Sequence, residues 1–91
     1  MLLTEEICLK LTEIFSRLSP IERQIIGEIS KYNRAVSRED IKQALSLSSM
    51  DLINGLRSLT RHYLLQRLEG DKIMFDLSPI VREYVRNCVV D

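Results

Sequence analysis

The stretch that decides the fold is LLQRLEGDKIMFDL, which occupies residues 64–77. Its second arm alternates apolar and polar side chains and places Ile73, Phe75 and Leu77 on one face, as expected for a half-buried strand. The two arms flank Glu69-Gly70-Asp71-Lys72, a polar segment with a glycine that is typical of a turn. Residues 64–77 are therefore predicted to form a β-hairpin.

Two short helices are predicted immediately before this hairpin. Ser37 can cap a helix over 38–46, and Ser48 or Ser49 can cap a second helix over 49–62. Apolar residues at helical spacing give each helix one inward face, namely Ile41, Ala44 and Leu45 in the first and Leu52, Ile53, Leu56, Leu59 and Tyr63 in the second. Because only a short serine-rich break separates the two, the pair is typical of a helix-turn-helix.

Three further helices and a strand complete the prediction. Thr4 caps a helix over 3–17, Ser19 opens one over 19–33 through a capping box with Glu22, and Ser78 precedes one over 79–89. Their inward faces are Ile7, Leu11, Ile14, Phe15 and Leu18, then Ile21, Ile25, Ile26 and Ile29, then Ile80, Val81, Tyr84, Val85 and Cys88. Leu3 and Cys8 are placed as a hydrophobic staple on the first helix. A strand stub at 35–36 would give the hairpin a third strand.

This order of elements predicts the fold class. A hairpin directly after the second helix of a helix-turn-helix is the winged arrangement, so the chain is expected to be mainly α with a small β-hairpin. It would be a winged helix-turn-helix with an extra N-terminal helix and a C-terminal helix. With 91 residues, 45% of them hydrophobic, the chain can fill one core, so 1–91 is predicted to be a single domain.

The balance of charged residues and the N-terminal sequence limit the classes of function and the cell compartment that we expect. The chain has 13 basic and 13 acidic residues, so any nucleic-acid surface must be a local feature. The N-terminus lacks the basic and apolar regions of a signal peptide, and no stretch is apolar enough to span a membrane. We expect a cytoplasmic protein with no membrane association, in which Cys8 and Cys88 are small buried hydrophobes.

Catalysis is not expected. His62 is the only histidine, and a distant metal site formed with Cys8 and Cys88 would lack an evident fourth ligand. Phosphate-binding glycine loops and nucleophile elbows are absent from the sequence. The sequence therefore predicts neither an enzyme nor a site for a metal or cofactor.

The second helix of the helix-turn-helix carries the candidate contact residues. Its predicted outward set is Met50, Asp51, Asn54, Gly55, Arg57, Ser58 and Arg61, and the hairpin adds Arg67 and Lys72. Asn54 could read adenine, and Arg57 or Arg61 could read guanine or hold a phosphate. The alternative is a merely solvated face, because Asp51, Glu69 and Asp71 offset much of the positive charge.

A family resemblance favours protein contacts. RLSPIE at 17–22, AVS at 35–37, LRSLTRHYLL at 56–65 and FDLSPIVREYV at 75–85 resemble the winged-helix module of bacterial STAND-class signalling ATPases, over about residues 15–85. The resemblance implies a connector that packs against an ATPase domain or a repeat domain and relays its nucleotide state. Residues 1–91 contain no ATPase or repeat sequence, as expected of either a fragment or a free-standing relative, so the nucleotide site is not carried over.

Two functions remain open at this stage. The first is a non-catalytic regulatory module that binds a protein partner or an adjacent ATPase or repeat domain, through surfaces such as Arg82-Glu83-Tyr84. The alternative is a regulator that binds double-stranded DNA through residues 49–62 and the hairpin. The N-terminal helix is expected to close the core of its own molecule, while a homodimer through it stays possible.

Overall fold

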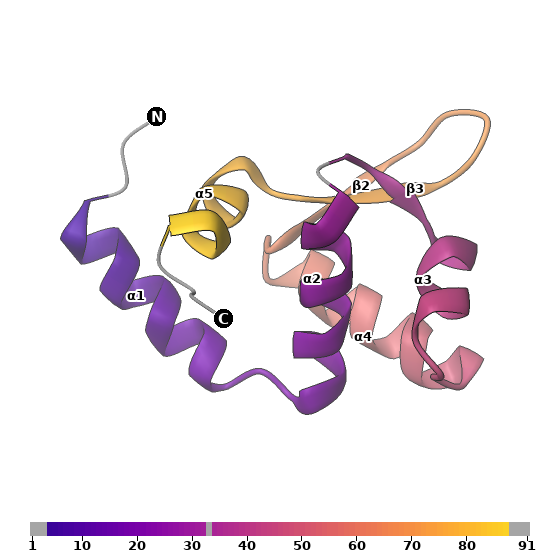
Figure 1. Ribbon diagram of the computed structural model, residues 1–91, viewed down its shortest axis with the longest axis horizontal. Helices are drawn as coiled ribbons and strands as arrows, with labels where there is room; N and C mark the ends of the chain where they lie inside the picture. The colour runs from indigo at the N-terminus through magenta and orange to yellow at the C-terminus, as the bar shows by residue number, and fades with distance from the viewer. Residues whose placement is uncertain (1–3, 33, 88–91) are drawn as a thin grey trace.

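The fold is helical with one small sheet, and its elements follow the predicted order (Figure 1). The structure, a computed structural model, describes residues 4–32 and 34–87. The helices are α1 (Glu5–Ser16), α2 (Pro20–Tyr32), α3 (Arg38–Ala44), α4 (Ser49–Arg61) and α5 (Pro79–Asn87). The strands are β1 (Val36–Ser37), β2 (Leu65–Leu68) and β3 (Met74–Leu77). The winged helix-turn-helix prediction is confirmed.

The predicted strand stub does join the hairpin. The sheet is antiparallel in the order β1-β3-β2, and Val36 lies opposite Phe75 in the register. The stub is shifted by one residue from the prediction, because Ser37 pairs with Met74 and also caps α3. We call β2, β3 and their connecting loop, residues 69–73, the wing.

Side-chain caps begin the helices where the sequence places them. The Thr4 hydroxyl accepts the Ile7 N–H, and Ser19 and Glu22 exchange hydrogen bonds in a capping box at the start of α2. Ser48, not Ser49, caps α4 by accepting the Asp51 N–H at 3.1 Å. Each cap satisfies an N–H that lacks a partner inside the helix, which is why these positions fix the helix starts. The proposed staple involves Leu3, which lies outside the described residues.

One core is formed by residues from all five helices and the sheet. Its most buried large side chains are Ile25, Ile29, Val36, Ile41, Leu52, Leu59 and Val81. Four residues predicted to face inward lie elsewhere: Ile14, Tyr63 and Ile73 are exposed large hydrophobics, and Ala44 is exposed at the end of α3. Tyr63 and Ile73 lie just outside α4 and β3, whereas Ile14 and Ala44 lie within α1 and α3 but on their exposed sides.

The helix α1 packs on its own molecule through α5. Leu11 is buried, Phe15 and Tyr84 stack with ring centroids 4.9 Å apart, and the Thr12 and Tyr84 hydroxyls lie 2.8 Å apart. Tyr84 is thus a core residue, which confirms its predicted place on the inward face of the last helix and removes it from the predicted Arg82-Glu83-Tyr84 contact surface. Cys8 is only partly buried against the same core, and Cys88 lies outside the described residues. A homodimer through α1 stays a prediction.

Candidate nucleic-acid interface

The exposed side of α4 carries most of the predicted contact residues. Leu52, Leu56 and Leu59 are buried, so the helix presents its opposite side to solvent. The exposed residues on that side are Met50, Asp51, Asn54, Arg57 and Arg61. Two cationic side chains one helical turn apart and an amide can all reach a surface laid against α4.

Gly55 does not belong to this exposed side, which corrects the prediction. It is buried where α4 packs on α2, and a Cβ at this position would lie 2.6 Å from Ile25 Cδ1. The absence of a side chain lets the two helices approach closely. The glycine is therefore a packing residue and presents nothing to a partner.

Ser58 is engaged inside the molecule. It is only partly exposed, and its hydroxyl faces the Glu22 carboxylate at the start of α2 closely enough to lower the pKa of Glu22. Burial raises the pKa of Glu22, but the hydrogen bonds with Ser58 and Ser19 and the charge of nearby His62 outweigh it and lower that pKa overall. His62 in turn places Nδ1 2.9 Å from the Ser58 carbonyl oxygen. Ser58 is thus better suited to positioning α4 than to contacting a ligand.

The end of α4 is closed by a Schellman motif with an unusual residue. Leu64 N–H donates to the Leu59 carbonyl at 3.0 Å, and Tyr63 N–H donates to the Thr60 carbonyl at 3.0 Å. Tyr63 occupies the left-handed position with φ 63°, which glycine normally fills, and its side chain is 84% exposed. The chain turns here from α4 into the wing.

The wing carries the other two predicted contact residues. Arg67 stands on β2 and Lys72 in the loop, and both are exposed. Arg67 Nε lies 3.6 Å from Glu69 Oε2, with both side chains largely open to solvent. An exposed pair of this kind is weak and exchanges readily for another anion.

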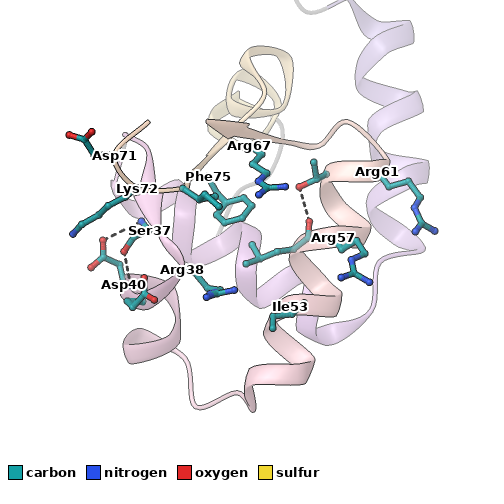
Figure 2. A pocket seen from close by; sticks show the side chains of 14 residues that line it. Ser37, Arg38, Asp40, Ile53, Arg57, Arg61, Arg67, Asp71, Lys72 and Phe75 are labelled. Carbon is teal, nitrogen blue, oxygen red and sulfur yellow. Dashed lines mark hydrogen bonds between the residues drawn. The ribbon is translucent and has the colours of Figure 1, made fainter. Parts of the chain in front are cut away.

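A groove of about 1010 Å³ separates α4 from the wing, and we call it the wing groove (Figure 2). Its basic residues are Arg38, Arg57, Arg61, Arg67 and Lys72, and its acidic residues are Glu39, Asp40 and Asp71. The structure thus brings four of the six predicted contact residues to one groove, while Asn54 and Ser58 lie outside it. Figure 2 shows Arg38 and Arg67 pointing into the groove from opposite sides.

Arg38 was missed in the sequence because it lies outside the second helix of the motif. It is the first residue of α3, directly after the Ser37 cap, and its side chain lines the groove between α4 and the wing. Lys42, one turn further along α3, donates to Ser49 Oγ at 2.7 Å and links α3 to the start of α4. The Ser37 cap, which marks the start of α3 in the sequence, was the signal that could have identified Arg38.

A metal site and a membrane span were also sought in the described part of the chain. Within residues 4–32 and 34–87, no three His, Cys, Asp or Glu side chains are grouped closely enough to hold a metal ion. None of the helices described is long and apolar enough to cross a membrane.

Comparison with solved structures supports the fold. The chain is similar to MepR, a transcription regulator of the Staphylococcus aureus multidrug efflux pump MepA, with a TM-score of 0.66 and 18% identity over 89% of this chain and 64% of MepR. It is equally similar to the ST1889 protein of the archaeon Sulfolobus tokodaii, with a TM-score of 0.66 and 18% identity over 78% of this chain and 72% of that one. The chain is a winged-helix module. No protein-family model matches the sequence, and no curated protein matches it either.

Proposed function

We propose that this winged-helix module binds double-stranded DNA with α4 in the major groove and the wing on the adjoining backbone. One observation carries the proposal: five basic residues from α3, α4, β2 and the wing loop line one groove, although the chain as a whole has equal numbers of basic and acidic residues. Local positive charge of this kind is what phosphate binding requires. The likeness of the fold to MepR, a transcription regulator, agrees with it.

The contacts divide into base readers and phosphate anchors. Asn54 and Arg57, on the exposed side of α4, are placed to meet base edges, where an amide suits adenine and a guanidinium suits guanine. Arg38, Arg67 and Lys72 flank α4 and are the proposed phosphate anchors. Arg61, at the end of α4, would hold a phosphate where the helix leaves the groove.

The proposal is tested by titrating a labelled random-sequence duplex at two salt concentrations. Binding that weakens steeply with salt is expected, and Arg67→Ala or Lys72→Ala should each reduce the slope of log affinity against log salt by about one. Lys10→Ala is the matched control, because Lys10 is an exposed cation on α1, at the far end of the molecule from the wing (Figure 1). If the duplex does not bind at low salt, or if Lys10→Ala matters as much, the proposal fails.

A base-reading role is tested separately, on sequences enriched by repeated selection from a random duplex pool. Arg57→Ala should weaken binding to the selected duplex by about tenfold or more while changing random-duplex binding less. Equal loss on both duplexes would make Arg57 a phosphate anchor. Failure to enrich any sequence would contradict base reading altogether.

A second candidate is the connector role that the STAND resemblance suggested. The equal numbers of acidic and basic residues favour it, because a chain without surplus positive charge has no general attraction for nucleic acid. In that role, the module would pack against an adjacent ATPase or repeat domain. The test is the coding sequence on both sides of this chain: a nucleotide-binding domain or repeats would support the connector, and stop codons at both limits would refute it.

A further inference from the structure

The floor of the wing groove is apolar although its edges are charged. Ile53 and Leu56 of α4 form one side of the floor, and Phe75 of β3 and Ile73 of the wing loop form the other. Ile73 is 45% exposed in the free protein. An aliphatic side chain left open between cations gains free energy when an apolar group covers it.

The charges around this floor are available to an external anion. Among residues 4–32 and 34–87, no carboxylate lies within ion-pair distance of Arg38, Arg57, Arg61 or Lys72. Of the acidic residues in the groove, Asp40 is engaged in the α3 cap, where its carboxylate accepts the Ser37 N–H. The groove therefore presents the unpaired guanidinium of Arg38 beside its apolar floor, together with that of Arg67, whose exposed pair with Glu69 can exchange for another carboxylate.

A DNA backbone would satisfy the cations and leave the floor uncovered. Phosphates and sugars have no bulky apolar group that could fill the space between Ile53, Ile73 and Phe75. A peptide carries both features on one chain, with carboxylates for Arg38 and Arg67 and an apolar side chain for the floor. Arginine pairs with carboxylates in a two-pronged geometry, which adds direction to the charge attraction.

We infer that the wing groove is a docking site for an acidic protein segment that inserts a bulky aliphatic or aromatic side chain between Ile53, Ile73 and Phe75. Carboxylates flanking that side chain pair with Arg38 and Arg67. The segment covers the same cations that the proposed DNA complex uses, so its binding excludes DNA. This exclusion rests on the proposed function, whereas the docking itself does not.

Direct docking is measured with two short fluorescein-labelled glutamate-rich peptides of equal length and charge. One peptide has a central Leu-Phe pair and the other a central Ser-Ser pair. The Leu-Phe peptide should bind about tenfold more tightly or better, the gain expected when an apolar side chain leaves water. Equal binding of the two peptides, or no binding of either at low salt, overturns the inference.

Two variants and a matched control assign the binding to the groove. Ile73→Ser should reduce affinity for the Leu-Phe peptide by about tenfold and leave the Ser-Ser peptide unchanged, while Arg38→Gln should weaken both peptides. Leu9→Ser is the control, since Leu9 is a 65% exposed aliphatic residue on α1, far from the groove. Melting curves establish that each variant is folded. Ile73, Arg38 and Leu9 are all exposed, so none of the three substitutions alters a buried side chain. A loss with Leu9→Ser equal to that with Ile73→Ser would overturn the assignment.

The relation to DNA is measured with the labelled duplex. The Leu-Phe peptide should displace the duplex, and Ile73→Ser should leave duplex affinity unchanged. If Ile73→Ser weakens the duplex as much as the peptide, the floor belongs to the DNA site and the inference is overturned. If no duplex binds but the Leu-Phe peptide does, the DNA proposal fails while the docking site stands.

Discussion

Replacing Gly55 with alanine tests the packing of α4 on α2 directly. The new Cβ would lie 2.6 Å from Ile25 Cδ1 and 3.4 Å from Ile21 Cγ2. The first distance is well inside van der Waals contact, so a side chain must move. Ile25 is completely buried, and its terminal methyl can move only into space that the core already fills.

The net effect is the balance of two opposing terms. Alanine in place of a mid-helix glycine stabilises the folded state by about 1 kcal/mol. Overpacking a filled core typically destabilises it by about 1–3 kcal/mol. We expect Gly55→Ala to destabilise the protein by about 1 kcal/mol, which for a chain of this size lowers Tm by about 4–8 °C.

Gly27→Ala is the matched control for the stabilisation gained when alanine replaces a glycine within a helix. Gly27 lies on the exposed side of α2, and nothing would lie within 4 Å of a Cβ there. This variant should gain about 1 kcal/mol, so the difference between the two variants isolates the clash. Ile25→Val removes the offending methyl, and in combination with Gly55→Ala it should recover part of the loss. The reasoning is refuted if urea unfolding shows Gly55→Ala to be as stabilising as Gly27→Ala.

Three further perturbations address single features of the fold. Tyr63→Gly should stabilise the protein by about 1 kcal/mol in urea unfolding, because it relieves the left-handed φ; destabilisation would mean that the exposed ring makes a stabilising contact. Tyr84→Phe should destabilise by about 1 kcal/mol through loss of the Thr12 hydrogen bond, and an unchanged Tm would show that water replaces it fully. Because the pKa of Glu22 is lowered on folding, its contribution is present above the ordinary glutamate pKa and is lost as pH falls through the folded-state pKa. Glu22→Gln should therefore lower stability at neutral pH and flatten its acid dependence, and identical pH profiles for variant and wild type would contradict the lowered pKa of Glu22.

The sequence predicted the elements of the fold because local signals determine them. Capping residues such as Ser19 and Ser37 act within a few residues of the chain, and the apolar periodicity of α2 and α4 reports a buried face without knowledge of its partner. The same patterns were less informative at the ends of elements. Tyr63 continues the helical period of α4 in the sequence, yet the helix ends at Arg61.

The candidate site was only partly predictable because it is formed by separate elements. Arg57, Arg61, Arg67 and Lys72 were found by their place on the helix and wing, while Arg38 comes from α3 and joins them only through tertiary packing. Gly55 was predicted to face outward because glycine has no apolar side chain and so does not count toward the apolar pattern of the helix. Its neighbour Ile25 lies far away in the sequence.

Ser37 has a consequence for how new specificity could be engineered into this module. This residue pairs with Met74 in the sheet and also caps α3, so the loop end of the wing strands is joined through β1 to the start of α3. The loop 69–73 lies beyond the last strand pair, Leu68 with Met74, and its residues are exposed. Loops of other lengths and charges could therefore be exchanged at this tip without changing the angle between wing and α4. Such a series of loop chimeras would vary the length and charge of the wing loop while the positions of β2, β3 and α4 stay the same.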